Sequence, residues 1–124
     1  MTAPNIVNVQ TITGSTSVLS LSTTANTSLV SNAASSSQVW KINNIVVANV
    51  NGTNACNFSL FYNNAAAGAG SNTAIASTIS IPANASLIAM DKSTALYLPE
   101  NTSLTVTAGT ANVLTVTVSY EIIS

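Results

Sequence analysis

Few side chains in this sequence could carry out acid–base or nucleophilic chemistry. The 124 residues include no histidine, one cysteine (Cys56) and three acidic residues, Asp91, Glu100 and Glu121. Without an imidazole there is no Ser-His or Cys-His nucleophile pair and no histidine-based zinc site. No two acids lie close together in the sequence, so neither a glycosidase carboxylate pair nor a calcium loop is predicted. We therefore expect no enzyme, no catalytic residue, no metal and no cofactor.

Charge is scarce throughout the chain. Charged residues make up 4% of the sequence, with two lysines and no arginine, and Ala, Ser, Thr and Asn account for 69 of the 124 residues. Because a nucleic-acid binder needs many cations to replace phosphate counterions, no nucleic-acid partner is expected. A net charge of −1 with 47% hydrophobic residues is typical of a folded chain rather than a disordered one.

Membrane insertion and secretion are not predicted either. The aliphatic runs are much shorter than the roughly 20 residues of a membrane-spanning helix. Residues 1–4 form neither a basic nor an apolar signal region, so no secretory signal is expected.

The elements that must position any site are β-strands. Residues 114–122 and 56–62 alternate between apolar and polar side chains, which is typical of half-buried strands. Residues 38–50 are apolar on both parities, which predicts a strand covered on both faces or a bulge near Asn43 and Asn44. Weaker strands are expected near 5–13, 17–22, 73–81, 86–90, 95–98 and 102–108.

The connections predict how these strands are arranged. Asn51-Gly52 is typical of a type I′ turn, so residues 38–50 and 54–63 are expected to form a hairpin. Residues 63–72 contain no large side chain and are expected to form an exposed loop. Together the pattern predicts an all-β, antiparallel two-sheet sandwich, Greek-key or jelly-roll-like. We divide the chain into an N-terminal strand or arm, 1–13, and a single β-sandwich domain, 14–124.

The aromatic residues allow two interpretations. Trp40, Phe61, Tyr62, Tyr97 and Tyr120 could form a sugar-stacking platform, or they could pack in the core. The neighbours of Trp40 and Tyr120 alternate cleanly, which favours the core for these two. Phe61 falls on the polar parity of its strand, so it is a candidate contact residue. Cys56 lies on the inward parity and is interpreted as a small buried hydrophobe.

The C-terminal two thirds of the chain resemble a family of virion proteins. The relevant segments are Ser80–Ile88 (SIPANASLI), Asp91–Ser93 (DKS) and Leu96–Val106 (LYLPENTSLTV). They resemble small structural proteins of tailed bacteriophages, especially phages of marine bacteria. In that family a strand ending in proline is followed by a short strand, an Asp-Lys turn and a hairpin. The resemblance implies a β-sandwich that decorates a capsid or joins head or tail components.

The sequence therefore predicts a capsid decoration or cement protein. A surface of small uncharged side chains suits permanent assembly, because such side chains lose little rotamer entropy on burial. We expect a homotrimer, with the major capsid protein or other virion proteins as further partners, in virions assembled in the host cytoplasm. A neck or tail connector is the alternative within this class, and a carbohydrate-binding or adhesin module is the alternative outside it.

The interface is predicted to involve the N-terminal segment. Ile6, Val7, Val9 and Ile12 are apolar within a polar surrounding, and Phe61 joins them as a candidate contact residue. Such a strand can complete its own sandwich or pair with the exposed sheet edge of a neighbouring subunit. We favour pairing with a neighbour.

Overall fold

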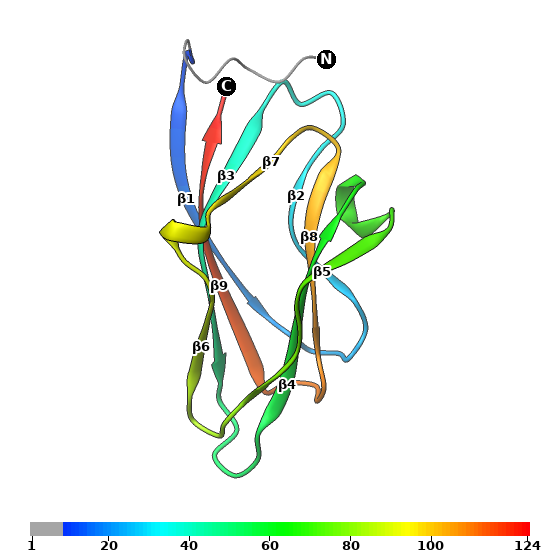
Figure 1. The fold of residues 1–124 in the computed structure, drawn as a ribbon, viewed down its shortest axis with the longest axis vertical. Helices are drawn as coiled ribbons and strands as arrows, with labels where there is room; N and C mark the ends of the chain where they lie inside the picture. The colour runs from blue at the N-terminus through cyan, green and yellow to red at the C-terminus, as the bar shows by residue number, and fades with distance from the viewer. Residues whose placement is uncertain (1–8) are drawn as a thin grey trace.

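The computed structural model describes residues 9–124 as two antiparallel β-sheets packed face to face (Figure 1). The first sheet has the order β1 (Ile12–Ser20), β9 (Leu114–Ile123), β3 (Val39–Asn49) and β6 (Ser86–Met90), and the short β7 (Leu96–Leu98) also pairs with β3. The second sheet has the order β2 (Thr27–Asn32), β8 (Thr102–Ala108), β4 (Cys56–Asn63) and β5 (Asn72–Ile81). The 3-10 turns η1 (Ala66–Gly68) and η2 (Lys92–Thr94) lie between strands. The predicted all-β sandwich is confirmed.

Alternating side chains build the core between the sheets. On β9 the even-numbered residues from Leu114 to Tyr120 are buried, while the odd-numbered residues between them stay half-exposed on the outer face. On β4, Phe58 and Leu60 are fully buried in the same core cluster. Burying a side chain of this size contributes about 1.5–3 kcal/mol, so the facing rows of the two sheets account for much of the stability.

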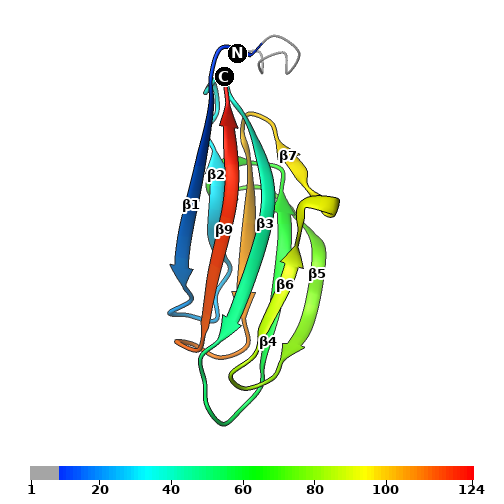
Figure 2. The ribbon, with the colours of Figure 1, turned by 90° about the vertical axis from the view of Figure 1, so that its left-hand side faces the viewer.

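The strand β3 has apolar residues on both parities because a bulge changes which parity faces the core: Ile42 is buried before it, and Ile45 and Val47 are buried after it. It pairs with β9 on one side and with β6 and β7 on the other (Figure 2). Its register against β9 shifts between Ile42 and Asn44. The predicted bulge near Asn43 and Asn44 is therefore confirmed, and it returns Ile45 to the core side of the strand.

The predicted hairpin between residues 38–50 and 54–63 is wrong. The strands β3 and β4 belong to different sheets, so the chain crosses the sandwich between them. Neither Asn51 nor Gly52 has the positive φ that a type I′ turn requires. Instead, Oδ1 of Asn51 accepts hydrogen bonds from the backbone N–H groups of Thr53, at 2.9 Å, and Asn54, at 3.3 Å. This side-chain turn carries the chain from one sheet to the other.

The N-terminal strands also differ from the prediction. Within the described residues, the strands expected at 5–13 and 17–22 are replaced by one strand, β1, which pairs with β9 along its whole length. Ile12 and Thr13, at the end of the predicted arm, are thus part of the sheet. The sequence did not predict β2, because Leu29 and Val30 are adjacent rather than alternating, and a register shift between Ser28 and Val30 accommodates them.

A buried asparagine ends each of three consecutive strands, β2, β3 and β4. Asn32, Asn49 and Asn63 are at most 2% exposed, and each binds the backbone of the connection that follows it. Asn49 Nδ2, for example, donates to the carbonyl oxygens of Asn54 and Ile81, at 3.1 and 2.9 Å. Buried polar groups need such partners, so these side chains fix the loops in the way that backbone pairing fixes strands.

Candidate assembly surface

The three acidic residues lie on separate elements of the fold. Asp91 precedes η2, Glu100 lies in the turn between β7 and β8, and Glu121 lies on β9. Among residues 9–124 there is no cluster of three potential metal ligands and no pocket. The described part of the chain contains no helix long and apolar enough to cross a membrane.

Asp91 has a structural function at the start of η2. Its carboxylate accepts hydrogen bonds from the hydroxyl and from the backbone N–H of Ser93, and the hydroxyl of Thr94 accepts one from the backbone N–H of Asp91. These bonds hold the pKa of Asp91 below its usual value, and the bond from the Ser93 hydroxyl has the largest effect. The carboxylate therefore acts as a helix cap.

The outer face of the five-stranded sheet is poor in charge. Aligned residues form rows across the strands, and one row is mostly apolar: Val18, Thr117, Val46 and Ile88. Val18 and Ile88, at the two ends of this row, are each 65% exposed. Another row contains Lys41 and Glu121 side by side, with Tyr97 beyond Lys41. We call this surface, centred on the two rows, the outer face of the β1–β9–β3–β6 sheet.

The structure does not bring the predicted interface residues together. Ile12 is 58% exposed at the start of β1, on the outer face just defined, and Val9 is half-buried just before it. Phe61 is half-buried on β4, where it aligns with Thr105 and Ala74 on the outer face of the other sheet. Ile6 and Val7 lie outside the described residues. Ile12 and Phe61 thus lie on opposite sides of the sandwich, and an interface shared by these residues stays a prediction.

The segment 63–72 covers part of the other outer face rather than standing free. The backbone N–H groups of Ala67 and Gly68 donate to the hydroxyls of Ser31 on β2, at 2.8 Å, and Ser103 on β8, at 3.0 Å. The Ser103 hydroxyl in turn donates to the Ala65 carbonyl oxygen. Ser103 and Thr105 are consequently fully buried although they face outward. Small side chains permit this close approach, and the sequence pattern gave no sign of it.

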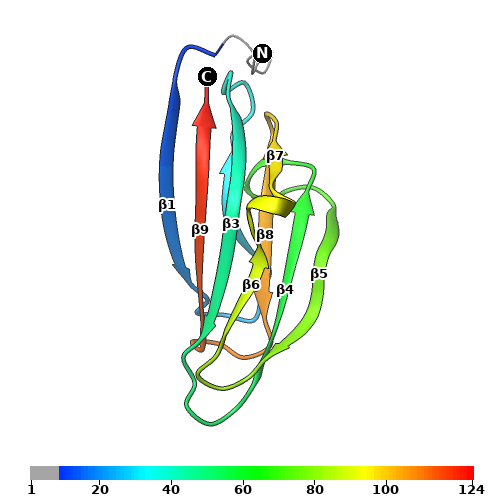
Figure 3. The ribbon, with the colours of Figure 1, turned by 60° about the vertical axis from the view of Figure 1, so that its left-hand side comes forward.

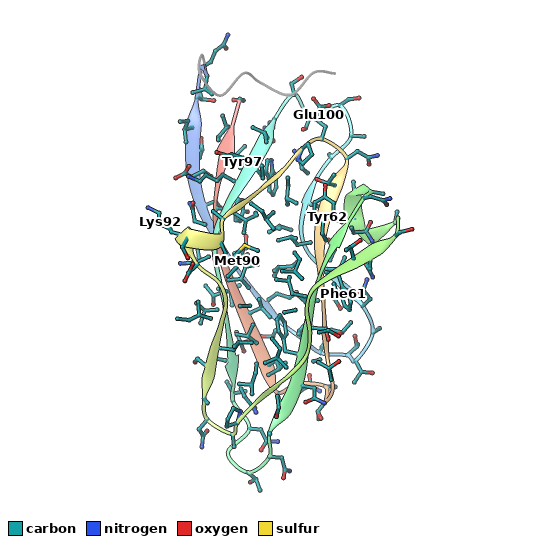
Figure 4. The ribbon with its side chains drawn as sticks, viewed as in Figure 1. Phe61, Tyr62, Met90, Lys92, Tyr97 and Glu100 are labelled. Atoms are coloured by element: carbon teal, nitrogen blue, oxygen red, sulfur yellow. The ribbon has the colours of Figure 1, made fainter. Side chains whose placement is uncertain are left out.

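The aromatic side chains do not form a sugar-stacking platform. Trp40 and Tyr120 stack on each other with ring centres 5.1 Å apart and belong to or pack against the core. Tyr62 also packs against the core, whereas Tyr97 is 46% exposed on the five-stranded sheet. Figure 4 shows Tyr97 on one sheet and Phe61 on the other. Because the two less buried rings lie on different sheets, they cannot stack on one ligand.

Cys56 is buried in the core cluster with 3% exposure. Its position agrees with the prediction of a small buried hydrophobe.

Comparison with known proteins identifies a fold but no family. No protein-family model matches the chain, and no curated protein matches it. A chain from Bacillus endospore appendages, described as disulfide-linked pili, is 17% identical over 91% of this chain and 87% of its own length, with a TM-score of 0.48. A chain of the T13 viral particle of IBDV is 9% identical and has a TM-score of 0.50. A chain of the Gt strain of infectious bursal disease virus is 10% identical, with a TM-score of 0.38.

The likeness to the IBDV particle concerns the fold alone. It covers 93% of this chain but only 31% of the viral chain, so this protein corresponds in length to one part of that protein. The two-sheet sandwich described above is therefore a fold that is also used in a viral particle.

Proposed function

We propose that this chain is a non-enzymatic structural component of a virus particle, specifically a capsid decoration or cement protein. The observation that carries the proposal is the charge-poor outer face of the β1–β9–β3–β6 sheet. Its mostly apolar row ends in two side chains that are each 65% exposed, Val18 and Ile88. Exposed apolar residues aligned across a sheet are typical of protein–protein contact surfaces.

The composition of this face favours a permanent contact over a transient one. Its rows consist mainly of small residues such as Thr16, Thr115 and Ser119, which lose little side-chain entropy when they are buried. Lys41 and Glu121 contribute opposite charges to a single row, so the rows carry no excess charge that would repel a second copy. A fold shared with a chain of the IBDV particle supports the same proposal.

We further propose that the protein forms homotrimers and binds the major capsid protein or another virion protein. Electron microscopy of purified virus particles, labelled with an antibody against this chain, tests the location. Regular labelling of capsids supports a decoration protein, and labelling confined to the neck or tail supports a connector instead. Particles that carry no label would contradict a structural function in the virion.

The N-terminal segment is proposed to act as an arm that binds a neighbouring subunit. A chain beginning at Ile12 keeps every described strand, because β1 starts at that residue. We expect this shortened chain to retain β-rich circular dichroism and to lose the trimer in sedimentation experiments. If it unfolds, or if it still forms trimers like the full chain, the arm proposal is wrong.

A further inference from the structure

The outer edge of β1 is the least protected sheet edge in the described structure. Proteins usually protect edge strands with bulges, short lengths, prolines or charged side chains. Among residues 9–124, the edge strands β2, β5 and β6 each contain a register shift against their neighbour, and β7, which pairs only with β3, is just 3 residues long. By contrast, β1 runs for nine residues without a shift and contains neither proline nor a charged residue. In Figures 2 and 3 no described strand lies beyond it.

The hydrogen bonds of β1 show which backbone groups this edge presents. Thr11 and Ser124 exchange both backbone hydrogen bonds, and the N–H of Leu21 donates to the carbonyl oxygen of Leu114. In an antiparallel ladder, bonded and non-bonded residues alternate. The odd-numbered residues of β1 therefore bond to β9, and the even-numbered residues point their N–H and C=O groups outward. The even-numbered residues of β1 also occupy the outer face of the sheet: Ile12, Gly14, Thr16, Val18 and Ser20.

We propose that β1 pairs with β1 of a second copy about a two-fold axis through Thr16. This inference rests on the proposed function, because it specifies one contact of the assembly. In this register Thr16 lies opposite the partner's Thr16, Gly14 opposite the partner's Val18, and Ile12 opposite the partner's Ser20. In this register the opposed even-numbered residues form the hydrogen-bonded pairs, so about ten outward-pointing backbone groups on each copy find partners. The two five-stranded sheets become one continuous sheet.

Gly14 and Val18 support this register independently. Gly14 does not have positive φ, and a Cβ placed on it would meet no atom within 4 Å. Neither backbone conformation nor crowding within the monomer therefore requires glycine there. In the paired strands the partner's Val18, which is 65% exposed in the monomer, lies directly beside this open position. Burial of its side chain over Gly14 occurs twice in each pair of copies, which favours this register over one shifted by two residues.

The pair contact is compatible with a trimer because each copy uses one edge for it. A trimer presents three β1 edges, and each edge can pair with a different trimer. Such pairing links trimers into a lattice, as a protein that stabilises a particle surface requires. The contact between two copies and the three-fold contact can therefore succeed or fail separately in an experiment.

Cysteine cross-linking measures the pairing directly. In the full chain, Thr16→Cys places two thiols on opposed residues with Cα atoms about 5.5 Å apart, within the range of a disulfide. The matched control Ser20→Cys lies on the same strand and face, but the two copies of this residue are about 26 Å apart along the paired strands. Cys56 is buried and contributes no background cross-link. We expect the Thr16→Cys protein to form covalent dimers on mild oxidation at least tenfold faster than the control.

Charge exchange at the same position tests the two-fold axis. Thr16→Lys and Thr16→Glu each place like charges opposite one another, so each variant alone is expected to dimerise several-fold more weakly. An equimolar mixture should restore pairing as Lys–Glu heterodimers, whereas Thr117→Lys, one strand further from the edge, should pair like the unmodified chain. Equal cross-linking of the two cysteine variants, or no recovery on mixing, overturns the proposal. Trimers that form without cross-linking at Thr16 overturn only this contact and leave the proposed function standing.

Discussion

Asn63 fixes the connection between β4 and β5, and its replacement by aspartate is the sharpest test of that function. Its Nδ2 donates to the carbonyl oxygen of Gly70, at 3.1 Å, and to Oδ1 of Asn72, at 2.8 Å. Its Oδ1 accepts hydrogen bonds from the backbone N–H groups of Ala65, at 3.0 Å, and Gly70, at 2.9 Å. In Asn63→Asp the accepting oxygen remains, but the other oxygen faces two acceptors.

The expected cost follows from these contacts. Asn72 can rotate its amide to relieve one of the two oxygen–oxygen contacts, although it then loses the hydrogen bond that its Oδ1 accepts from Thr105. The carbonyl of Gly70 belongs to the peptide unit whose N–H, from Ser71, donates to Oδ1 of Asn64, so turning it away breaks that bond. The side chain at position 63 is fully shielded from water. One lost bond, one weakened bond and a buried charge together reduce the free energy of unfolding by about 3 kcal/mol near neutral pH.

The pH dependence has a definite sign. Burial and the facing acceptors raise the pKa of the introduced carboxyl above the unfolded value of about 3.9, because the protonated form can donate to Gly70. The folded state then binds the proton more tightly, so the loss of stability is present at neutral pH and decreases as the pH falls through the folded-state pKa. The slope is about 1.4 kcal/mol per pH unit between the folded and unfolded pKa values.

Urea unfolding followed by the fluorescence of Trp40 measures the effect. Asn64→Asp is the matched control, since Asn64 is exposed and uses only Oδ1, which accepts a hydrogen bond from the backbone N–H of Ser71 and which aspartate retains. We expect the control to change the free energy of unfolding by less than about 0.5 kcal/mol. If both variants lose the same stability, or if the loss at position 63 does not shrink between about pH 7 and pH 4, the buried asparagine does not act as described.

Three further predictions follow from other parts of the structure. Phe58→Ala should lower the free energy of unfolding, measured by urea unfolding, by about 3–5 kcal/mol because Phe58 is fully buried. In the same measurement Val18→Ala on the outer face should change the free energy of unfolding by less than about 0.5 kcal/mol. The unmodified chain, which has no histidine, should keep a constant melting temperature between about pH 6 and pH 8, and a large change there would reveal a strongly shifted carboxyl group. The pKa of Asp91 is lower in the folded state than in the unfolded state, so its carboxylate stabilises the fold at pH values above the unfolded-state pKa. This stabilisation is lost as the pH falls through the folded-state pKa. Asp91→Asn should therefore reduce the acid sensitivity of thermal unfolding below about pH 4.

Sequence periodicity predicted most strands, because apolar alternation depends only on which face of a strand is buried. The strand 86–90 has the predicted bounds, and β9 buries the predicted parity. Pairing was harder to predict, because Asn51-Gly52 can form either a hairpin turn or the side-chain turn seen here. The three buried asparagines could not be found in advance, since Asn32, Asn49 and Asn63 are chemically identical to thirteen other asparagines in the chain.

The candidate surface was predicted only in its general character. Scarcity of charge indicated assembly, but it did not indicate which face or edge would be exposed. The regular outer edge of β1 depends on an alignment with β9, whose paired residues lie 95 to 111 positions away in the sequence. No local pattern contains that information.

The position of β9 between β1 and β3 determines when the five-stranded sheet can form. Among the described strands β9 comes after all the others in the chain, yet it lies between β1 and β3 and pairs with both. Until β9 pairs with them, β1 has no partner in its own sheet, and the apolar sides of β1 and β3 lack their central neighbour. Folding therefore depends on contacts between distant segments and is expected to be slow for a domain of this size. A chain that lacks β9 cannot form the five-stranded sheet, because β1 and β3 are joined only through it.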